Sequence, residues 1–512
     1  MTSTDQQPVI DFLRAENALG AGPVQVNTTH VSKIFLSGER ALKMKRAVKF
    51  PFLDFQTLEA RHQACVQEVE INRRTAPSIY KGVVAVTKTP DGGYELGGAG
   101  TPVEWLVDMV RFDEDTLFDR LAGVERGLRR PRIEALADTI AEFHAAAEIR
   151  ATSGGHAGIR MIAENNARSF EILPPDSFEK NKASSVAAET LKRIDNVAAV
   201  LDDRRDAGRV RICHGDLHLR NICLIDDKPT LFDAIEFSSD FSDIDVMYDL
   251  AFLLMDLDFH GLRRLSAFLL NRYLDVGDER ADVFQVLPIF LSMRAQIRAH
   301  VGAAIARAQE KPEDQERELA TARRYLELAE QYLQRKPPRL VAVGGLSGSG
   351  KSRLAREIAS HLGQAPGARV VRTDVVRKRL NGIHPNESLG AHGYTSEMTE
   401  KTYQDFFGQA RSALAAGQCV VLDAVFAKAE QRAQADTLAI ECGVPYQGLW
   451  VDAPEHVRVH RVETRERNVS DVTTDVARQQ SEYELGPITW AKIDSSGKKN
   501  ATIDQALKVL KV

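Results

Sequence analysis

The chain has 512 residues, of which 43% are hydrophobic and 27% charged, and its formal net charge is −5 at pH 7. At roughly 100 to 200 residues per domain this length predicts two or three compact units, and no apolar run approaches the roughly 18 residues of a membrane-spanning helix. Because 67 basic residues face 72 acidic ones, no overall basic field favours nucleic acid as a partner.

The amino-terminal segment MTSTDQQPVIDFLRAENALG carries acidic residues where a signal peptide would carry basic ones, and it lacks a continuous apolar stretch. Five cysteines are scattered along the chain without CxxC spacing, as is typical of proteins from a reducing compartment. We therefore expect a cytoplasmic protein that is not exported.

Residues 31–112 contain short runs rich in Val, Ile, Phe and Tyr, separated by turn signals such as GER and DGG, and they predict a small antiparallel sheet. The run ALKMK places Lys43 and Lys45 on one face of a strand, and the helical segment that follows offers Glu68 and Glu70. A lysine paired with a glutamate in this way holds nucleotide phosphates in kinases. We favour Lys43 with Glu68 as the nucleotide-binding pair and leave Lys45 and Glu70 open.

Helical patterns dominate from about residue 130 to 335, and PRIEALADTIAEFHAAAEI begins with a proline suited to a first turn. The exception is RVRICHGDLHLRNICLIDDKPTLFDAI, in which Asp216 and Asn221 lie five residues apart and Asp233 follows a turn and a short strand. Magnesium-dependent phosphoryl transfer needs a carboxylate near the acceptor and two oxygen ligands for the metal. We predict Asp216 as the catalytic residue, with Asn221 and Asp233 as magnesium ligands.

Two other interpretations of this segment are weaker. His214 and His218, together with Cys213, suggest zinc, but a loop before a strand is not a helix face and no fourth ligand has suitable spacing. A loop that merely buries a histidine and caps a turn with an aspartate explains neither Asn221 nor Asp233.

With these residues in place, the chain from about residue 30 to 335 resembles the aminoglycoside phosphotransferase and choline kinase group. The loop of that group reads HGDLHxxN, and its metal aspartate opens a D-x-x-E-like motif, here Asp233 and Glu236. The segment YDLAFLL, residues 248–254, also resembles the stretch after the metal site in that group. The resemblance implies a two-lobed protein-kinase-like α+β fold, ATP, Mg²⁺ and a hydroxylated small molecule as acceptor.

The sequence departs from the protein-kinase pattern at the nucleotide loop. No G-x-G-x-x-G precedes Lys43, and the glycines of DGGYELGGAG lie between two strand patterns, which predicts hairpin turns instead. The acidic residues between 240 and 245 are more typical of a solvated turn than of a pocket for a cationic drug.

A domain boundary is expected near residue 336. The segment PEDQERELATARRYLELAEQYLQ predicts an amphipathic helix, which Pro337 and Pro338 must end before the buried-strand run LVAV begins. We predict a first domain at 1–336, with a small lobe at about 25–115 and a large lobe at about 116–336, and a second domain at 337–512.

The second domain opens with GLSGSGKS, which matches G-x-x-x-x-G-K-[ST] between a strand pattern and a helix pattern. Backbone amides and the helix N-terminus would cradle phosphate oxygens, Lys351 would reach the terminal phosphates as a catalytic residue, and Ser352 would bind Mg²⁺. The alternative is a glycine-rich turn without a ligand. The predicted nucleotide-binding residues are Gly345, Ser347, Gly348, Ser349, Gly350, Lys351 and Ser352.

Three later strand patterns end in Asp374, Asp423 and Asp452, and such ends face the ligand crevice of a parallel sheet. We predict Asp374 as a catalytic base and Asp423 as a residue near the magnesium ion, although aspartates here could simply cap helices. The arginine-rich segment HVRVHRVETRERN places Arg461 and Arg465 on one helix face. We expect these two arginines to bind the nucleotide as part of a closing lid rather than to form a solvated face.

Residues 339–512 resemble the P-loop small-molecule kinases, which include gluconate kinase-like, polynucleotide kinase-like and zeta-toxin-like members. The whole chain resembles bacterial proteins that fuse an aminoglycoside phosphotransferase-like domain to a P-loop, AAA-type domain, which implies a multi-domain α/β protein with a parallel sheet in its second part. We expect a kinase with two ATP sites acting on small-molecule hydroxyls. The alternatives are a nucleotide-dependent switch and a kinase for nucleic-acid ends; neither the acceptors nor the oligomeric state follows from the sequence.

Overall fold

A computed structural model describes residues 6–15, 19, 22–50, 53–125, 127–179, 181–464 and 474–512. The chain forms two compact units, each built from two stretches. Met1–Gly158 and Asp202–Leu253 make the first unit, and Ile159–Leu201 and Leu254–Val512 make the second. The expected boundary near residue 336 falls within the second unit and stays a prediction.

The first unit contains the predicted antiparallel sheet, with six strands in the order β1-β2-β3-β8-β6-β7. The glycine-rich segment between β6 and β8 forms turns of antiparallel hairpins, as predicted from its position between two strand patterns. In chain order the strands are β1 Gln25–Thr28, β2 Ser32–Ser37, β3 Arg40–Lys45, β6 Tyr80–Lys88, β7 Tyr94–Leu96 and β8 Thr101–Val110, and a small hairpin adds β4 Lys49–Phe50 and β5 Leu53–Asp54.

Helices cover both faces of this sheet. Helix α1 (Gln7–Arg14) packs on the face that carries Leu42 and Met44, whereas α2 (Leu58–Asn72) packs on the face that carries Ala41. Because successive side chains of a strand point to opposite faces, β3 directs Lys43 and Lys45 toward the α2 side. The alternation in ALKMK therefore decides where these two charges lie.

The rest of the first unit holds two short antiparallel pairs, β9 with β12 and β10 with β11. Helix α4 begins at Arg130 with a proline in its first turn, as predicted. The elements are η1 Glu114–Thr116, α3 Phe118–Ala122, α4 Arg130–Ala146, β9 Val210–Ile212, η2 Leu219–Asn221, β10 Ile222–Ile225, β11 Lys228–Leu231, α8 Ser239–Ser242 and β12 Asp243–Asp245. Three helices have residues in both units: α5 Gly155–Glu171, α7 Ala198–Asp206 and α9 Val246–Phe259.

The second unit begins with α6 (Lys182–Asn196), α10 (Arg263–Val276), α11 (Val283–Arg307) and α12 (Pro312–Leu333). Helix α12 buries one stripe of apolar side chains and ends before the two prolines that were predicted to stop it. The Ser292 hydroxyl of α11 donates to the Ala329 carbonyl of α12 at 2.9 Å, so the two helices are in direct contact.

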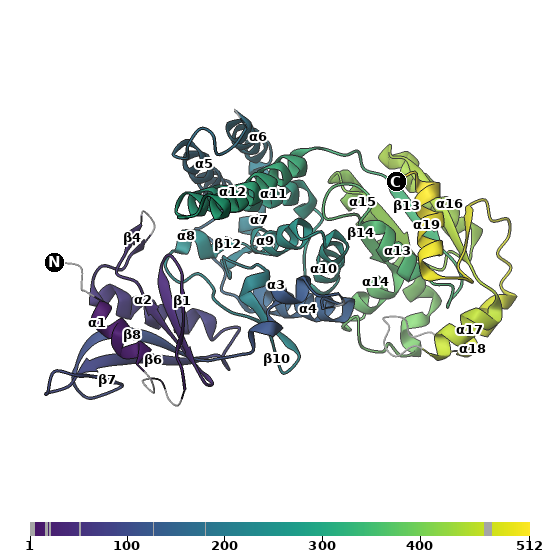
Figure 1. Ribbon diagram of the computed structural model, residues 1–512. Helices are drawn as coiled ribbons and strands as arrows, with labels where there is room; N and C mark the ends of the chain where they lie inside the picture. Colours follow the sequence, from purple (N-terminus) through teal and green to yellow (C-terminus); the bar gives the residue numbers. More distant parts are fainter. Residues whose placement is uncertain are drawn as a thin grey trace. The chain divides into compact units, whose positions relative to one another are not determined.

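The same unit contains the predicted parallel sheet, in the order β14-β15-β13-β16-β17. Its strands are β13 Leu340–Gly344, β14 Arg369–Arg372, β15 Val420–Asp423, β16 Tyr446–Asp452 and β17 Ala491–Asp494. Its helices are α13 Lys351–Ala359, α14 Thr373–Leu380, η3 Ala391–Tyr394, α15 Ser396–Ala415, α16 Ala429–Cys442, α17 Glu455–Glu463, α18 Thr474–Gln479, η4 Gln480–Glu482 and α19 Lys499–Leu510. Helix α13 packs on β13, β14 and β15, and α19 packs beside α13 and against the edge strand β17 (Figure 1, green to yellow).

Membrane insertion was not expected from the sequence. Within the described ranges, no helix is both long enough and apolar enough to cross a membrane. All five cysteines are free thiols, and four of them are buried.

Candidate active sites

The first candidate site lies between the sheet of the first unit, α2 and the loop after β11. Lys43 Nζ lies 2.8 Å from Glu68 Oε1 and 2.6 Å from Asp233 Oδ1. Lys45 Nζ lies 2.5 Å from the second oxygen of Glu68 and also pairs with Glu236. Glu68 is fully buried, whereas Glu70 is exposed. The structure thus brings both candidate lysines, and only the first of the two candidate glutamates, into one charge cluster.

The charges of this cluster support one another. Burial alone would lower the pKa of Lys43, but Asp233 and Glu68 outweigh it and raise that pKa well above its usual value. Burial would raise the pKa of Glu68, yet the two lysines hold it below its usual range. For Glu236 burial prevails over the attraction of Lys45, so its pKa is raised. A charged lysine–glutamate pair therefore stands beside the candidate metal aspartate at neutral pH.

The loop HGDLHLRN brings Asp216 and Asn221 together. The Asn221 Nδ2 group donates to the Asp216 carbonyl at 2.9 Å and to its Oδ2 atom at 3.0 Å, and His218 Nε2 lies 3.3 Å from the same carboxylate. The Asp216 side chain remains 38% exposed. His214 Nε2 is 2.9 Å from the Phe232 carbonyl, which ties this loop to the end of β11. Asp216 is thus held in place and still open to an acceptor.

A residue that the sequence analysis missed anchors this loop. Asp249, on α9, accepts hydrogen bonds from the backbone amides of His214 at 3.1 Å and Gly215 at 2.9 Å, and it lies 3.1 Å from His144 Nε2. Its side chain is fully buried. The only available signal was an acidic residue within the apolar run YDLAFLL. Asp249 fixes the backbone that carries Asp216.

The zinc alternative finds no support in the arrangement of the predicted ligands. Among the described residues, the metal-type side chains that cluster are His144, Cys213 and Asp249, not His214 and His218 with Cys213. Asp249 already accepts the two loop amides.

Two further side chains missed by the sequence analysis hold the loop that carries Asp233. The Asp233 amide donates to the Tyr80 hydroxyl at 3.1 Å, and the Ala234 amide donates to Asn72 Oδ1 at 2.8 Å. Tyr80 and Asn72 are buried. Asp233 has φ 62°, a left-handed conformation that non-glycine residues rarely adopt. Residues of β6 and α2 therefore keep this carboxylate in a strained position next to Lys43.

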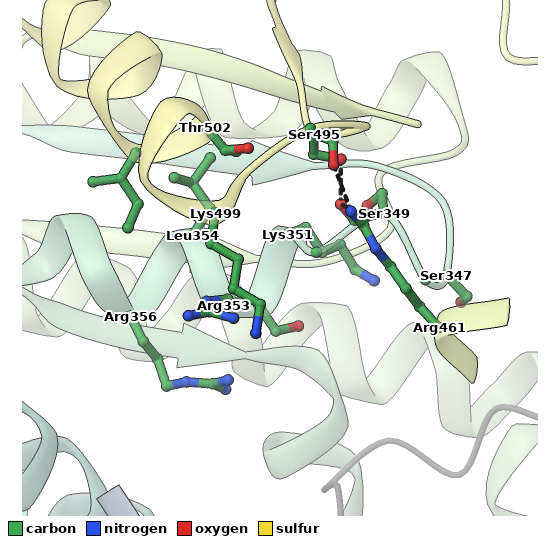
Figure 2. A pocket seen from close by; sticks show the side chains of 15 residues that line it. Ser347, Ser349, Lys351, Arg353, Leu354, Arg356, Arg461, Ser495, Lys499 and Thr502 are labelled. Carbon is green, nitrogen blue, oxygen red and sulfur yellow. Dashed lines mark hydrogen bonds between the residues drawn. The ribbon is translucent and has the colours of Figure 1, made fainter. Parts of the chain in front are cut away.

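The second candidate site surrounds the phosphate loop, residues 345–352. A cavity of about 350 Å³ is lined by this loop and by residues of α13, α17, α19 and the turn before α19. Figure 2 shows Lys351 of α13 and Arg461 of α17 among the side chains that line it. Gly345 and Gly348 have φ 146° and 83°, and a Cβ atom would meet backbone oxygens at 2.4 and 2.3 Å, respectively. The loop geometry therefore requires glycine at both positions.

A line of hydrogen bonds runs from the phosphate loop into the sheet. The Ser352 hydroxyl donates to Asp423 Oδ1 at 3.1 Å, and Arg372 Nε donates to Asp423 Oδ2 at 3.3 Å. Asp374 lies in the first turn of α14, directly after β14, and is half-buried, whereas Asp452 is exposed at the end of β16. Asp423 thus has the contact with Ser352 that its expected role requires, and Asp452 does not enter this line.

The expected arginine lid is only partly within the described residues. Arg461 donates to the Ser349 carbonyl at 3.4 Å and to the Ser495 carbonyl at 2.6 Å. Arg465, the other predicted lid residue, lies outside the described residues. Ser495, which the sequence analysis missed, donates to the Ser349 carbonyl at 2.6 Å (Figure 2). Arg461 and Ser495 together fix one side of the phosphate loop.

The donor sets of both sites fit magnesium, which prefers oxygen ligands. In the first site, Asn221 uses its Nδ2 group to bind Asp216, so its amide oxygen can serve a metal together with the carboxylate of Asp233. In the second site, the Ser352 hydroxyl and the Asp423 carboxylate are already adjacent.

Comparisons with known proteins identify two families along the chain. Residues 87–284 match the family described as phosphotransferase enzyme family, and residues 340–485 match the family described as AAA domain. The chain is 31% identical over 500 residues to an uncharacterized protein of Mycobacterium tuberculosis, and the alignment covers 95% of each chain.

Two further comparisons cover parts of the chain. Over 117 residues it is 34% identical to adenylyl-sulfate kinase of Myxococcus xanthus, which covers 23% of this chain and 59% of that protein. A solved structure of a choline/ethanolamine kinase family protein from Mesorhizobium loti is 13% identical, with a TM-score of 0.37, and covers 64% of this chain and 99% of that one.

Proposed function

We propose that this chain transfers the γ-phosphoryl group of ATP to hydroxyl groups of small molecules. The chain belongs to the same family as the mycobacterial protein, and it joins a phosphotransferase-family domain to an AAA domain. In this proposal the first domain spans 1–336 and the second 337–512, and each binds ATP with Mg²⁺ in the cytoplasm. The observation that carries the proposal is the cluster in which Lys43 contacts both Glu68 and Asp233.

In the first site, Lys43 would exchange the Asp233 carboxylate for phosphate oxygens while Glu68 keeps its ammonium group in position. Asn221 and Asp233 would hold Mg²⁺, which when bound neutralises the charge that develops on the transferring group. Asp216, partly exposed and oriented by Asn221, would accept the proton of the substrate hydroxyl. Catalysis would rest mainly on positioning and on charge neutralisation.

In the second site, the amides of the phosphate loop and Lys351 would hold the triphosphate, and Ser352 would bind Mg²⁺ beside Asp423. Asp374, at the carboxyl end of the edge strand β14, is the proposed base. Arg461 lines the cavity, and we propose that Arg461 and Arg465 bind the nucleotide as parts of a lid.

The test is acceptor phosphorylation by wild type, Asp216→Ala and Lys351→Ala, followed by mass spectrometry with sugars, amino alcohols, nucleosides and aminoglycosides. Each variant should lose a different product, and Glu70→Ala, a change at an exposed position of the helix that carries Glu68, should lose neither. If ATP binds at both sites and no acceptor is phosphorylated, the chain is a nucleotide-dependent switch and the proposal of transfer fails.

A further inference from the structure

The edge of the parallel sheet is closed by a side chain from the helices that precede it. Strand β14 is an edge strand, so one row of its backbone groups has no partner strand. Asn271 of α10 fills this role within the second unit. Its Oδ1 atom accepts from the Val370 amide at 2.7 Å, and its Nδ2 group donates to the Ala368 carbonyl at 3.0 Å.

A buried ion pair fixes the same contact. Arg369 of β14 lies 2.7 Å from Asp275 of α10 and donates to the Asn271 carbonyl at 3.2 Å. Asn271, Arg369 and Asp275 are all nearly inaccessible, with side chains or residues less than 10% exposed. A buried charge pair is tolerated only when its geometry and hydrogen bonds are well defined. This pair and the hydrogen bonds of Asn271 therefore attach β14 to α10.

The clamped strand leads directly to the phosphate loop. Three residues after Arg369, Arg372 donates to Asp423, and Asp423 accepts from Ser352, the proposed magnesium ligand. Asp374, the proposed base, follows two residues later. A displacement of β14 would therefore move the proposed base Asp374 and also disturb Asp423, which contacts the proposed magnesium ligand.

We propose that Asn271 is a positioning residue for the P-loop site and that α10 is a structural component of that site. Residues 337–512, which contain the phosphate loop, do not include α10, although α10 holds the strand that leads to the proposed base Asp374. The kinetic test of this inference rests on the proposed function. A second test measures nucleotide binding and does not depend on phosphoryl transfer.

The experiment uses the full chain with Asn271→Leu, which is similar in size and cannot form either hydrogen bond. Asn166→Leu is the matched control, because Asn166 is a buried, hydrogen-bonded asparagine of the same unit that contacts Met293 and His300 of α11 instead of the sheet. Asn271→Asp serves as a milder variant, since it keeps the acceptor for Val370 and loses the donor to Ala368.

We expect Asn271→Leu to lower kcat of the Lys351-dependent reaction roughly tenfold, with a smaller loss for Asn271→Asp. The Asp216-dependent kcat should stay within about twofold of wild type in both. Equal losses in the two reactions, or a loss in Asn166→Leu as large as in Asn271→Leu, would overturn the inference.

The proposed function and the inference fail in different ways. If wild type forms no Lys351-dependent product, transfer at this site is wrong, and the affinity for a fluorescent ATP analogue with Mg²⁺ then decides the inference. We expect Lys351→Ala to abolish binding of the ATP analogue at the second site, and Asn271→Leu to weaken it. Binding equal to that of Asn166→Leu would refute the positioning role.

Discussion

The hydroxyl of Tyr80 offers a sharp test of how the first site is held. Tyr80→Phe keeps the ring and removes the oxygen that accepts from the Asp233 amide at 3.1 Å. A buried amide left without an acceptor costs about 1 to 3 kcal/mol. Asp233 also has a left-handed conformation at φ 62°, which favours relaxation to an ordinary backbone conformation once the hydrogen bond of its amide is lost.

The expected result is a weaker magnesium site rather than an unfolded protein. Since 1.4 kcal/mol corresponds to a factor of ten, the Mg²⁺ concentration for half-maximal turnover should rise on the order of tenfold or more. The assay is Asp216-dependent turnover against Mg²⁺ concentration, in a Lys351→Ala background that silences the second site.

Tyr332→Phe is the control for this test, because it removes a buried tyrosine hydroxyl that contacts Asp258 in the second unit at 3.0 Å. Its magnesium dependence should match that of the parent. An unchanged magnesium dependence in Tyr80→Phe, or an equal shift in Tyr332→Phe, would refute the role assigned to the Tyr80 contact.

Three further predictions follow from the buried contacts. Glu68→Gln should abolish Asp216-dependent turnover and lower the free energy of unfolding by on the order of 3 kcal/mol, while Glu70→Gln changes neither. The pKa of Glu68 is lowered to about 2 in the folded chain. Its contribution to stability is therefore fully present above the unfolded pKa of roughly 4.3 and is lost progressively as pH falls from there through the folded pKa. Urea titrations should show less acid sensitivity in Glu68→Gln, and an unchanged pH profile would contradict the assignment. Asp249→Asn should lower the Asp216-dependent kcat by roughly ten- to a hundredfold, since two loop amides share its carboxylate, and the Lys351-dependent reaction of the same variant is the internal control. Gly348→Ala should remove ATP binding at the second site because its Cβ would meet the Arg458 carbonyl at 2.3 Å, whereas Gly382→Ala, at a similar positive φ with open space around it, should bind normally.

The sequence was sufficient where function depends on local spacing. Strand alternation predicted that Lys43 and Lys45 share a face, and the five-residue spacing predicted that Asp216 and Asn221 could act together. Both are properties of a single turn or strand, so a short window contains the necessary information. The two sheets were predicted for the same reason, since period-2 and buried-strand patterns are local signals.

The side chains that hold these residues could not be predicted, because their partners are distant in the chain. Tyr80 and Asn72 meet the Asp233 loop across more than 150 residues, and Asn271 meets Val370 across 99. Nothing near Asn271 in the sequence indicates that it pairs with an edge strand instead of lying in the helix core. Such contacts are a property of the assembled fold and have no local periodicity.

The two candidate sites share one physical feature: the groups proposed to bind nucleotide or metal are already paired with other parts of the protein. Lys43 holds Asp233, and Ser352 holds Asp423. Arg461 holds the Ser349 carbonyl of the phosphate loop and the Ser495 carbonyl. A ligand must therefore exchange existing contacts, and its net binding energy is the difference between the new contacts and the old. At Lys43 the exchange also releases Asp233 to serve as a metal ligand, so ATP and Mg²⁺ should each increase the affinity for the other at this site.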